Sequence, residues 1–167
     1  MKQRVLGLYW YEYSKTAQEL RLNVRQDSTW LNSTYYYPSS WVIPQQYINS
    51  KSSDFDWCVI KTQSPIGNTT GWFGYGYTTV IYNKSIITSG YPDQAGMRYK
   101  QYMCTGIMNS SSSYRFYTDC DVEGGQSGSP AYDYDGIIWG VIQSASPSLN
   151  YGCLVTSTVY NTIESMK

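Results

Sequence analysis

The sequence predicts an all-β fold, and three observations support this. The chain of 167 residues carries 19 Tyr and 6 Trp, and charged residues make up only 14% of it. Aromatic and β-branched residues favour half-buried pleated surfaces, and the Asn, Ser, Gly and Pro residues between them favour turns. Segments such as residues 20–25 alternate apolar and polar side chains with period two, which is typical of a strand with one buried face. This length is enough for one core, or for two small cores packed together.

The charge balance excludes binding by bulk electrostatics. Lys and Arg number 12, as do Asp and Glu, so the formal net charge is zero and nothing attracts nucleic acid or an anionic membrane. No apolar run approaches the ~20 residues that cross a bilayer, and the apolar stretch after Met1 is too short for a signal peptide. The surface-type composition, rich in Tyr, Ser, Asn and Thr, still suggests an exported protein. No metal or cofactor is expected.

Turn residues divide the chain into short strands. The expected strands are residues 20–25, 40–44, 54–61, 85–92, 101–108, 114–120, 131–132, 137–142 and 150–156. Residues 158–164 are expected to form a closing helix, because apolar residues stand at 159, 160 and 163. The loop-type stretch 64–71 is the candidate boundary between two halves, 1–66 and 67–167.

The four cysteines permit up to two disulfides, and one pair follows from strand register. If the serine run 109–113 is a hairpin turn centred on Ser112, Cys104 and Cys120 lie at equal distances on either side. They would then face each other across the two strands, close enough to form a disulfide. Cys58 and Cys153 lie in apolar runs and are interpreted as buried thiols.

Asp56 is the carboxylate that calls for an explanation. Within an expected strand over 54–61, period two places it on the same face as Cys58 and Ile60. A carboxylate on an inward face needs a hydrogen-bonding or charged partner. Asp54, by contrast, is interpreted as an ordinary turn residue before the strand.

The stretch Gly124-Gly125-Gln126-Ser127-Gly128-Ser129-Pro130 is the strongest candidate for chemistry. Glycine before the serine allows backbone N–H groups to turn toward one point, and a small residue after it leaves room for a substrate carbonyl. That arrangement suits an oxyanion hole around a nucleophile. Composition alone favours a plain Gly/Ser turn.

Taken together, the motifs resemble the glutamyl endopeptidase branch of the chymotrypsin-like serine proteases. The matching stretches, in the order of that family, are residues 56–61, 64–75, 89–92, 124–130 and 150–152. The resemblance covers about residues 20–165. It implies a double β-barrel with an incomplete N-terminal barrel (residues 1–66), a C-terminal barrel (residues 67–167) and a short C-terminal helix.

The resemblance also assigns roles to individual residues. Ser127 would be the nucleophile, Asp56 would orient the catalytic histidine, and the N–H groups of Gly125 and Ser127 would form the oxyanion hole. It further implies a protein or peptide substrate, no cofactor and a secreted protein.

The chain departs from the family because it contains no histidine. The histidine motif of the family should fall near residues 5–8, and those residues do not supply it. We therefore expect either a truncated chain or a pseudoenzyme that has lost its general base. Without the base, serine is a weak nucleophile, and the residual acceleration over water is typically ~10³–10⁴. A lysine could replace the base in principle, and the candidates are Lys61, Lys84 and Lys100.

The residues of the implied specificity pocket depart as well. Ile142 stands where the family has a glutamate-binding histidine, and Val122 stands in place of a threonine. Asp121 corresponds to a carboxylate at the pocket base in some relatives. An unpaired substrate carboxylate would be costly against these apolar side chains, so the sequence predicts an apolar or unusual preference instead of glutamate.

Two other interpretations remain open. The chain could be a non-catalytic module that holds peptides in the cleft or glycans on its Tyr-rich surface. A Tyr-rich β-sandwich explains the composition without explaining the motif order. Missing barrel strands would leave open edges, so we expect a monomer unless a partner chain supplies strands.

Overall fold

The computed structural model describes residues 22–23, 35–65, 67–97, 100–144 and 149–167 of the chain. The strands are β1 Leu22–Asn23, β2 Tyr35–Tyr36, β3 Pro38–Val42, β4 Val59–Thr62, β5 Gly74–Tyr75, β6 Lys84–Gly90, β7 Tyr102–Ser110, β8 Arg115–Thr118, β9 Pro130–Tyr132, β10 Ile137–Ser144 and β11 Asn150–Leu154. The helices are α1 Gln45–Ser50, α2 Gly67–Thr70 and α3 Ser157–Ser165, with a 3-10 turn, η1, at Ser53–Phe55. The all-β prediction is therefore confirmed.

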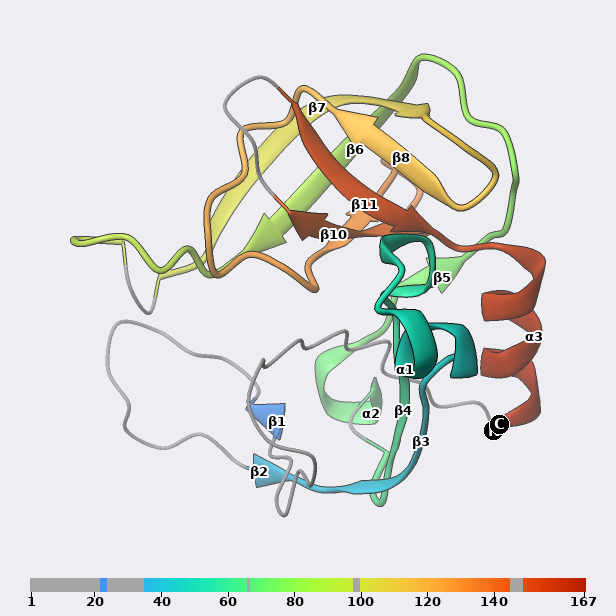
Figure 1. Cartoon of the computed structure of the whole chain (residues 1–167). Coiled ribbons are helices and arrows are strands. Elements are labelled where there is room, and N and C mark those ends of the chain that lie inside the picture. The colour runs from blue at the N-terminus through green and yellow to red at the C-terminus, as the bar shows by residue number, and fades with distance from the viewer. Residues whose placement is uncertain (1–21, 24–34, 66, 98–99, 145–148) are drawn as a thin grey trace.

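Six strands form a closed barrel. Their order is β11-β8-β7-β6-β9-β10, and β10 closes the ring by pairing antiparallel with β11. The short β5 joins β10 in parallel outside the ring. Two separate pairs, β1–β2 and β3–β4, lie below the barrel in Figure 1. All barrel strands follow residue 83, whereas β1 to β4 end by residue 62. A division of the chain at residues 66 and 67 stays a prediction.

Phe116 is at the centre of the barrel core. Its side chain is fully buried among apolar residues of the surrounding strands. A Cβ at Gly140 of β10 or at Gly152 of β11 would come within 2.5 Å or 2.4 Å of the ring. The ring can fill the barrel because these two neighbouring strands carry no side chain there.

A second apolar cluster joins the barrel to the rest of the chain. It contains Trp57 and Val59 before and within β4, Ile138 of β10, and three residues around and within α3 (Val155, Val159 and Ile163). The N-cap of α3 is Thr156, whose hydroxyl accepts a hydrogen bond from the Val159 N–H. The closing helix expected over 158–164 is thereby confirmed. In Figure 1 α3 descends from the barrel beside β3 and β4, and this cluster explains its position.

The expected disulfide is present, although the strand register from which it was predicted differs by one residue. Cys104 and Cys120 are joined, with their Cα atoms 5.8 Å apart. The β7–β8 ladder pairs Met108 with Thr118, so the hairpin is centred one residue later than expected. Strand β8 ends at Thr118, and the chain turns after it, which brings Cys120 back to Cys104. Cys58 and Cys153 are free thiols, as predicted; Cys153 is buried and Cys58 is half-buried.

The strand expected over 54–61 begins later than predicted. Residues 53–55 form η1, and the Trp57 N–H donates to the Phe55 carbonyl at 2.9 Å. Asp56 lies between them with φ −78° and ψ 71°, the geometry of an inverse γ-turn. The short helices α1 and α2 were not expected either. Tertiary contact holds α1, whose Tyr47 is buried.

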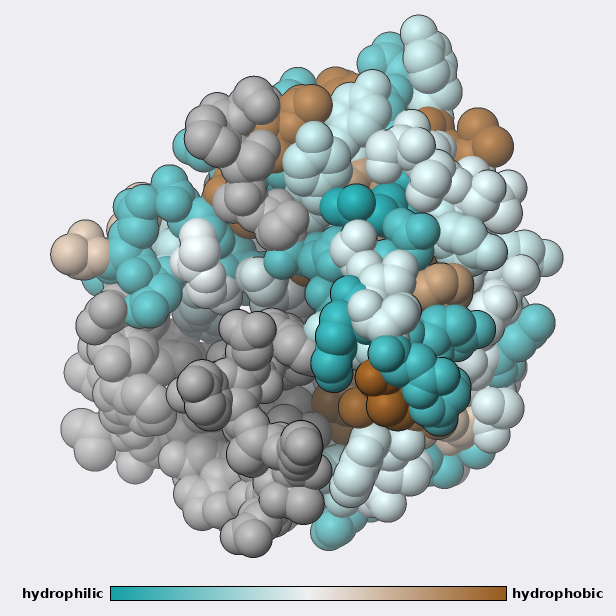
Figure 2. All heavy atoms as spheres, in the orientation of Figure 1, coloured by the Kyte–Doolittle hydropathy of each residue, from teal (hydrophilic) through white to brown (hydrophobic). Residues whose placement is uncertain are grey.

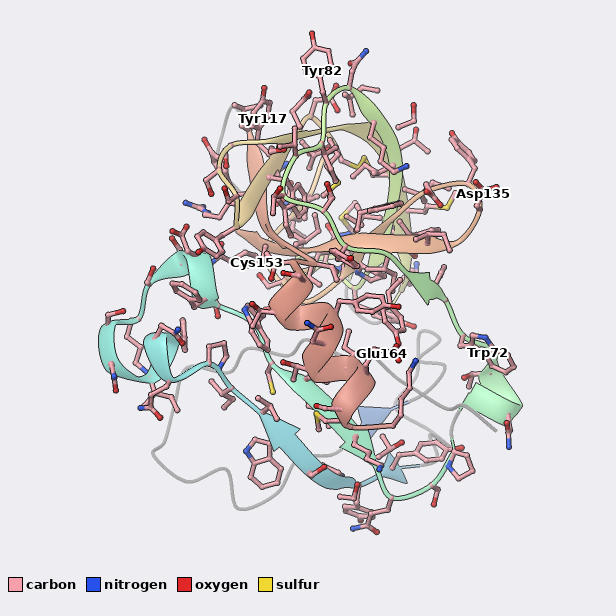
Figure 3. All side chains as sticks on the ribbon, turned by 90° about the vertical axis from the view of Figure 1, so that its right-hand side faces the viewer. Trp72, Tyr82, Tyr117, Asp135, Cys153 and Glu164 are labelled. Atoms are coloured by element: carbon pink, nitrogen blue, oxygen red, sulfur yellow. A yellow bond between two sulfur atoms is a disulfide. The ribbon has the colours of Figure 1, made fainter. Side chains whose placement is uncertain are left out.

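One face of the molecule is mostly polar to neutral. The face in Figure 2 shows mainly teal and pale residues, with only small brown groups. Tyr82, Tyr117 and Asp135 lie at the outer rim of the barrel in Figure 3. Within the described residues, no helix is both long and apolar enough to span a membrane.

Asp133 organises the β9–β10 hairpin. Its carboxylate accepts hydrogen bonds from the Trp139 indole (2.7 Å) and the Ile137 N–H (3.0 Å), and it pairs with Lys84 Nζ at 3.0 Å. Burial alone would raise the pKa of Asp133, but these donors outweigh it and lower the pKa below the ordinary 3.8. The charged carboxylate is therefore the form that stabilises the hairpin.

We expect Asp133→Asn to lower the free energy of unfolding by about 1–3 kcal/mol at pH 7, because charged hydrogen bonds are replaced by weaker ones. A lowered carboxyl pKa contributes stability that is present at neutral pH and is lost as pH falls through the folded pKa. The gap between variant and parent should thus narrow below about pH 4. Urea unfolding at pH 7 and pH 3 measures this difference in the free energy of unfolding. Asp135→Asn, exposed in the same turn, is the control and should change little.

Candidate active site around Ser127

Two consecutive turns form the loop that contains Ser127. The Gln126 N–H donates to the Glu123 carbonyl at 3.1 Å, and the Ser129 N–H donates to the Gln126 carbonyl at 3.0 Å. The third residue of each turn is a glycine with positive φ: Gly125 at 95° and Gly128 at 90°. Ser127 is the second residue of the second turn, and it is exposed. The glycine spacing seen in the sequence thus forms the loop that presents the serine.

Three hydrogen bonds fix this loop to β10. The Gly128 N–H donates to the Ile142 carbonyl at 2.8 Å, and the Ile142 N–H donates to the Ser129 carbonyl at 2.9 Å. The Ser127 hydroxyl donates to the carbonyl of Gln143 at 2.9 Å. The loop is also held from within, because the buried Gln126 side chain accepts a hydrogen bond from the Glu123 N–H.

The peptide before Gly125 has a defined orientation. The Gly124 carbonyl accepts a hydrogen bond from the Asp93 N–H at 2.7 Å. In a trans peptide the C=O and the following N–H point in opposite directions, so the Gly125 N–H points away from Asp93. A Cβ at Gly125 would lie 2.7 Å from the Asp93 nitrogen, so no other residue fits without movement. Among the described residues, neither the Gly125 nor the Ser127 N–H donates to another group.

Asp56 reaches the same site through Gln143. Its carboxylate accepts a hydrogen bond from Gln143 Nε2 at 2.8 Å. Gln143 therefore contacts Asp56 with its side chain and Ser127 with its main chain. The partner that the sequence required for Asp56 is an uncharged amide. Gln143 was not singled out in the sequence; the available signal was a long amide side chain directly after Ile142 at the end of an apolar strand.

Two of the three expected pocket residues lie in the barrel core. Val122 and Ile142 are buried and belong to the same apolar cluster as Phe116. Asp121 is exposed, immediately before Val122. Asn150, the first residue of β11, is buried. Its side-chain amide donates a hydrogen bond to the Cys120 carbonyl at 2.6 Å, which fixes the backbone just before Asp121 and Val122.

The candidate replacement bases have other environments. Lys84 pairs with Asp133 and lies over the Trp139 ring, 4.6 Å from its centroid. Lys61 and Lys100 are exposed, Lys61 on β4 and Lys100 just before β7. No group of three or more His, Cys, Asp or Glu side chains that could hold a metal ion occurs in the described part of the chain.

Comparisons with known proteins find relatives that are named as proteases. No family model matches the chain. A stretch of 105 residues is 35% identical to the glutamyl endopeptidase of Bacillus licheniformis, covering 61% of this chain and 30% of that protein. Another match, 28% identical over 142 residues, is to a Bacillus subtilis protein named extracellular metalloprotease; it covers 81% of this chain and 43% of that protein. The chain thus spans less than half the length of these curated relatives.

Solved structures agree on the fold. A Glu endopeptidase in complex with MPD superposes with a TM-score of 0.74 at 28% identity, over 84% of this chain and 67% of that one. Neuropsin, a serine protease of mouse brain, gives a TM-score of 0.74 at 13% identity, over 91% of this chain and 81% of its own. The neuropsin likeness shows the fold alone. The chain is a homologue of glutamyl endopeptidase and has the fold of the chymotrypsin-like serine proteases.

Proposed function

We propose that this chain carries the nucleophile and the oxyanion hole of a serine endopeptidase site but does not hydrolyse peptides at a useful rate. Ser127 is the nucleophile, Asp56 is the carboxylate that would orient a triad histidine, and the N–H groups of Gly125 and Ser127 form the oxyanion hole. The substrate class is protein or peptide, and secretion is part of the same proposal.

One observation carries the proposal. The Ser127 hydroxyl donates a hydrogen bond to the main-chain carbonyl of Gln143, which is too weak a base to take the proton, and the chain contains no histidine. A serine is activated when a neighbouring base accepts the hydroxyl proton as the oxygen attacks. The Asp56 carboxylate, which would orient such a base, is hydrogen-bonded to the Gln143 amide. The oxyanion donors therefore support binding of a carbonyl, while no described side chain accepts the hydroxyl proton.

A peptide-binding module is the second candidate. The exposed Ser127 favours it, as do the N–H groups of Gly125 and Ser127, which donate to no described residue and can hold a peptide carbonyl without chemistry. The apolar Val122 and Ile142 favour an apolar side chain over a glutamate beside Ser127.

Incubation with a fluorogenic peptide library tests both candidates. We expect turnover no higher than that of Ser127→Ala. If the module interpretation holds, a separate binding assay with the same peptides should show measurable affinity. Turnover that exceeds the Ser127→Ala value by ~10³-fold or more would overturn the inactive assignment. Preferential cleavage after Glu, or preferential binding of peptides that contain Glu, would overturn the predicted apolar preference.

A further inference from the structure

The segment that presents Asp56 has little structure of its own. It consists of the single turn η1 and the γ-turn at Asp56, and the strand β4 begins only at Val59. In Figure 1 this segment lies directly beneath β10 and β11. Its position therefore depends on contacts with the barrel.

Two side chains of the barrel donate hydrogen bonds to this segment. Gln143 Nε2 donates to the Ser53 carbonyl at 3.2 Å and to the Asp56 carboxylate at 2.8 Å. Cys153 Sγ contacts the Ser53 carbonyl at 3.3 Å and the Asp56 carbonyl at 3.4 Å. Gln143 and Cys153 each contact both Ser53 and Asp56, and both lie about ninety to a hundred positions further along the chain.

Cys153 is suited to act as a hydrogen-bond donor. The side chain is buried, and Figure 3 shows it at the lower end of the barrel beside the start of α3. Burial and the neighbouring Asp56 charge raise the pKa of the Cys153 thiol to about 12. The thiol therefore keeps its proton at neutral pH. Thiol hydrogen bonds are weak, so the amide-to-carboxylate bond of Gln143 supplies most of the hold.

Gln143 also connects this segment to the serine. Its main-chain carbonyl accepts the Ser127 hydroxyl at 2.9 Å while its side-chain amide holds Asp56. Within the described residues, the buried Gln143 Oε1 has no hydrogen-bond partner. A buried amide oxygen left unpaired is costly, so the other contacts of this side chain must compensate for it.

We propose that Gln143 and Cys153 form a clamp that positions Asp56 relative to Ser127. Both are positioning residues, since they act through Asp56 and Ser127. The catalytic meaning of the clamp rests on the proposed function of those two residues, whereas its effect on the Asp56 turn does not.

Thiol chemistry tests the clamp without requiring catalysis. In a Cys58→Ser background, Cys153 is the remaining free thiol, because Cys104 and Cys120 are joined. We expect slow reaction with DTNB and an infrared S–H stretch shifted by hydrogen bonding to carbonyl groups. Adding Gln143→Ala should release the turn, raise the DTNB rate by about tenfold and move the S–H band toward that of a free thiol.

Gln63→Ala is the matched control. The Gln63 amide also donates to a main-chain carbonyl, that of Pro38 at 3.3 Å, but it lies away from the clamp. This variant should leave both readouts unchanged. An unchanged DTNB rate and S–H band in folded Gln143→Ala would overturn the proposal. If that variant does not fold, Gln143→Asn gives the same comparison, and a free-thiol band in Cys58→Ser alone is equally contrary.

A second readout separates this proposal from the proposed function. Phosphonylation of Ser127 by a fluorophosphonate in the presence of imidazole should slow about tenfold in Gln143→Ala. The Ser127 oxygen attacks phosphorus, fluoride leaves, and imidazole accepts the hydroxyl proton. Failure of Ser127 to react in every variant would contradict the proposed function, while the thiol readouts would still decide the clamp.

Discussion

Phe116→Ala should lower the free energy of unfolding by about 3–5 kcal/mol, a large fraction of the stability of a domain of this size. The ring is fully buried at the centre of the barrel and packs directly on the backbone of Gly140 and Gly152. Alanine would leave a cavity, and the two glycines carry no side chain that could collapse into it. Urea unfolding followed by tryptophan fluorescence measures the change.

Tyr117→Ala is the natural control for that substitution. Tyr117 is the next residue in β8, half-buried, and it lies at the outer rim of the barrel in Figure 3. Its loss should cost about 1 kcal/mol or less. Equal losses for the two variants would contradict the assignment of Phe116 as the centre of the core.

Gly125→Ala should reduce imidazole-supported acylation of Ser127 by about 10²–10³-fold, the usual effect of losing one oxyanion donor. Gly125 has a φ of 95°, and an added Cβ would lie 2.7 Å from the Asp93 nitrogen. The peptide would have to rotate, which breaks the Gly124–Asp93 hydrogen bond and turns the Gly125 N–H away. Hydrolysis of an activated ester in imidazole buffer, after subtraction of the rate with Ser127→Ala, measures the loss.

Gly71→Ala is a suitable control for the strain alone. Gly71 also has a positive φ, 77°, but no atom lies within 4 Å of an added Cβ, and the position is remote from the serine loop in sequence. This variant should be somewhat less stable, by about 1–3 kcal/mol, and should keep the acylation rate. Equal rates in Gly125→Ala and the parent would exclude Gly125 as an oxyanion donor.

The sequence predicted those parts of the structure that depend on local pattern. The strands expected over 131–132 and 137–142 are confirmed as parts of β9 and β10, and a turn in which the Gly136 N–H donates to the Asp133 carbonyl joins them. The spacing of apolar residues predicted α3, and two of them, Val159 and Ile163, are buried. The cysteine pair was also confirmed, because a displacement of the hairpin centre by one residue still leaves the two cysteines within reach.

Contacts between distant segments could not be predicted in the same way. Period two placed Asp56 in a strand, but hydrogen bonds from Gln143 and Cys153 instead hold it in a turn. Those donors lie 87 and 97 residues further along the chain, and no local pattern indicates their reach. The resemblance gave roles to Ser127 and Asp56, but Gln143, which contacts both, became visible only in three dimensions.

The central claim is that Ser127 has its oxyanion donors but lacks a base. The most direct test is the rate at which a fluorophosphonate labels Ser127, measured with increasing imidazole and compared with Ser127→Ala. We expect very slow labelling without imidazole and a rate that rises with the concentration of neutral imidazole, because the added base accepts the hydroxyl proton. Rapid, stoichiometric labelling of Ser127 without imidazole would contradict the claim, since it would require a base within the chain itself.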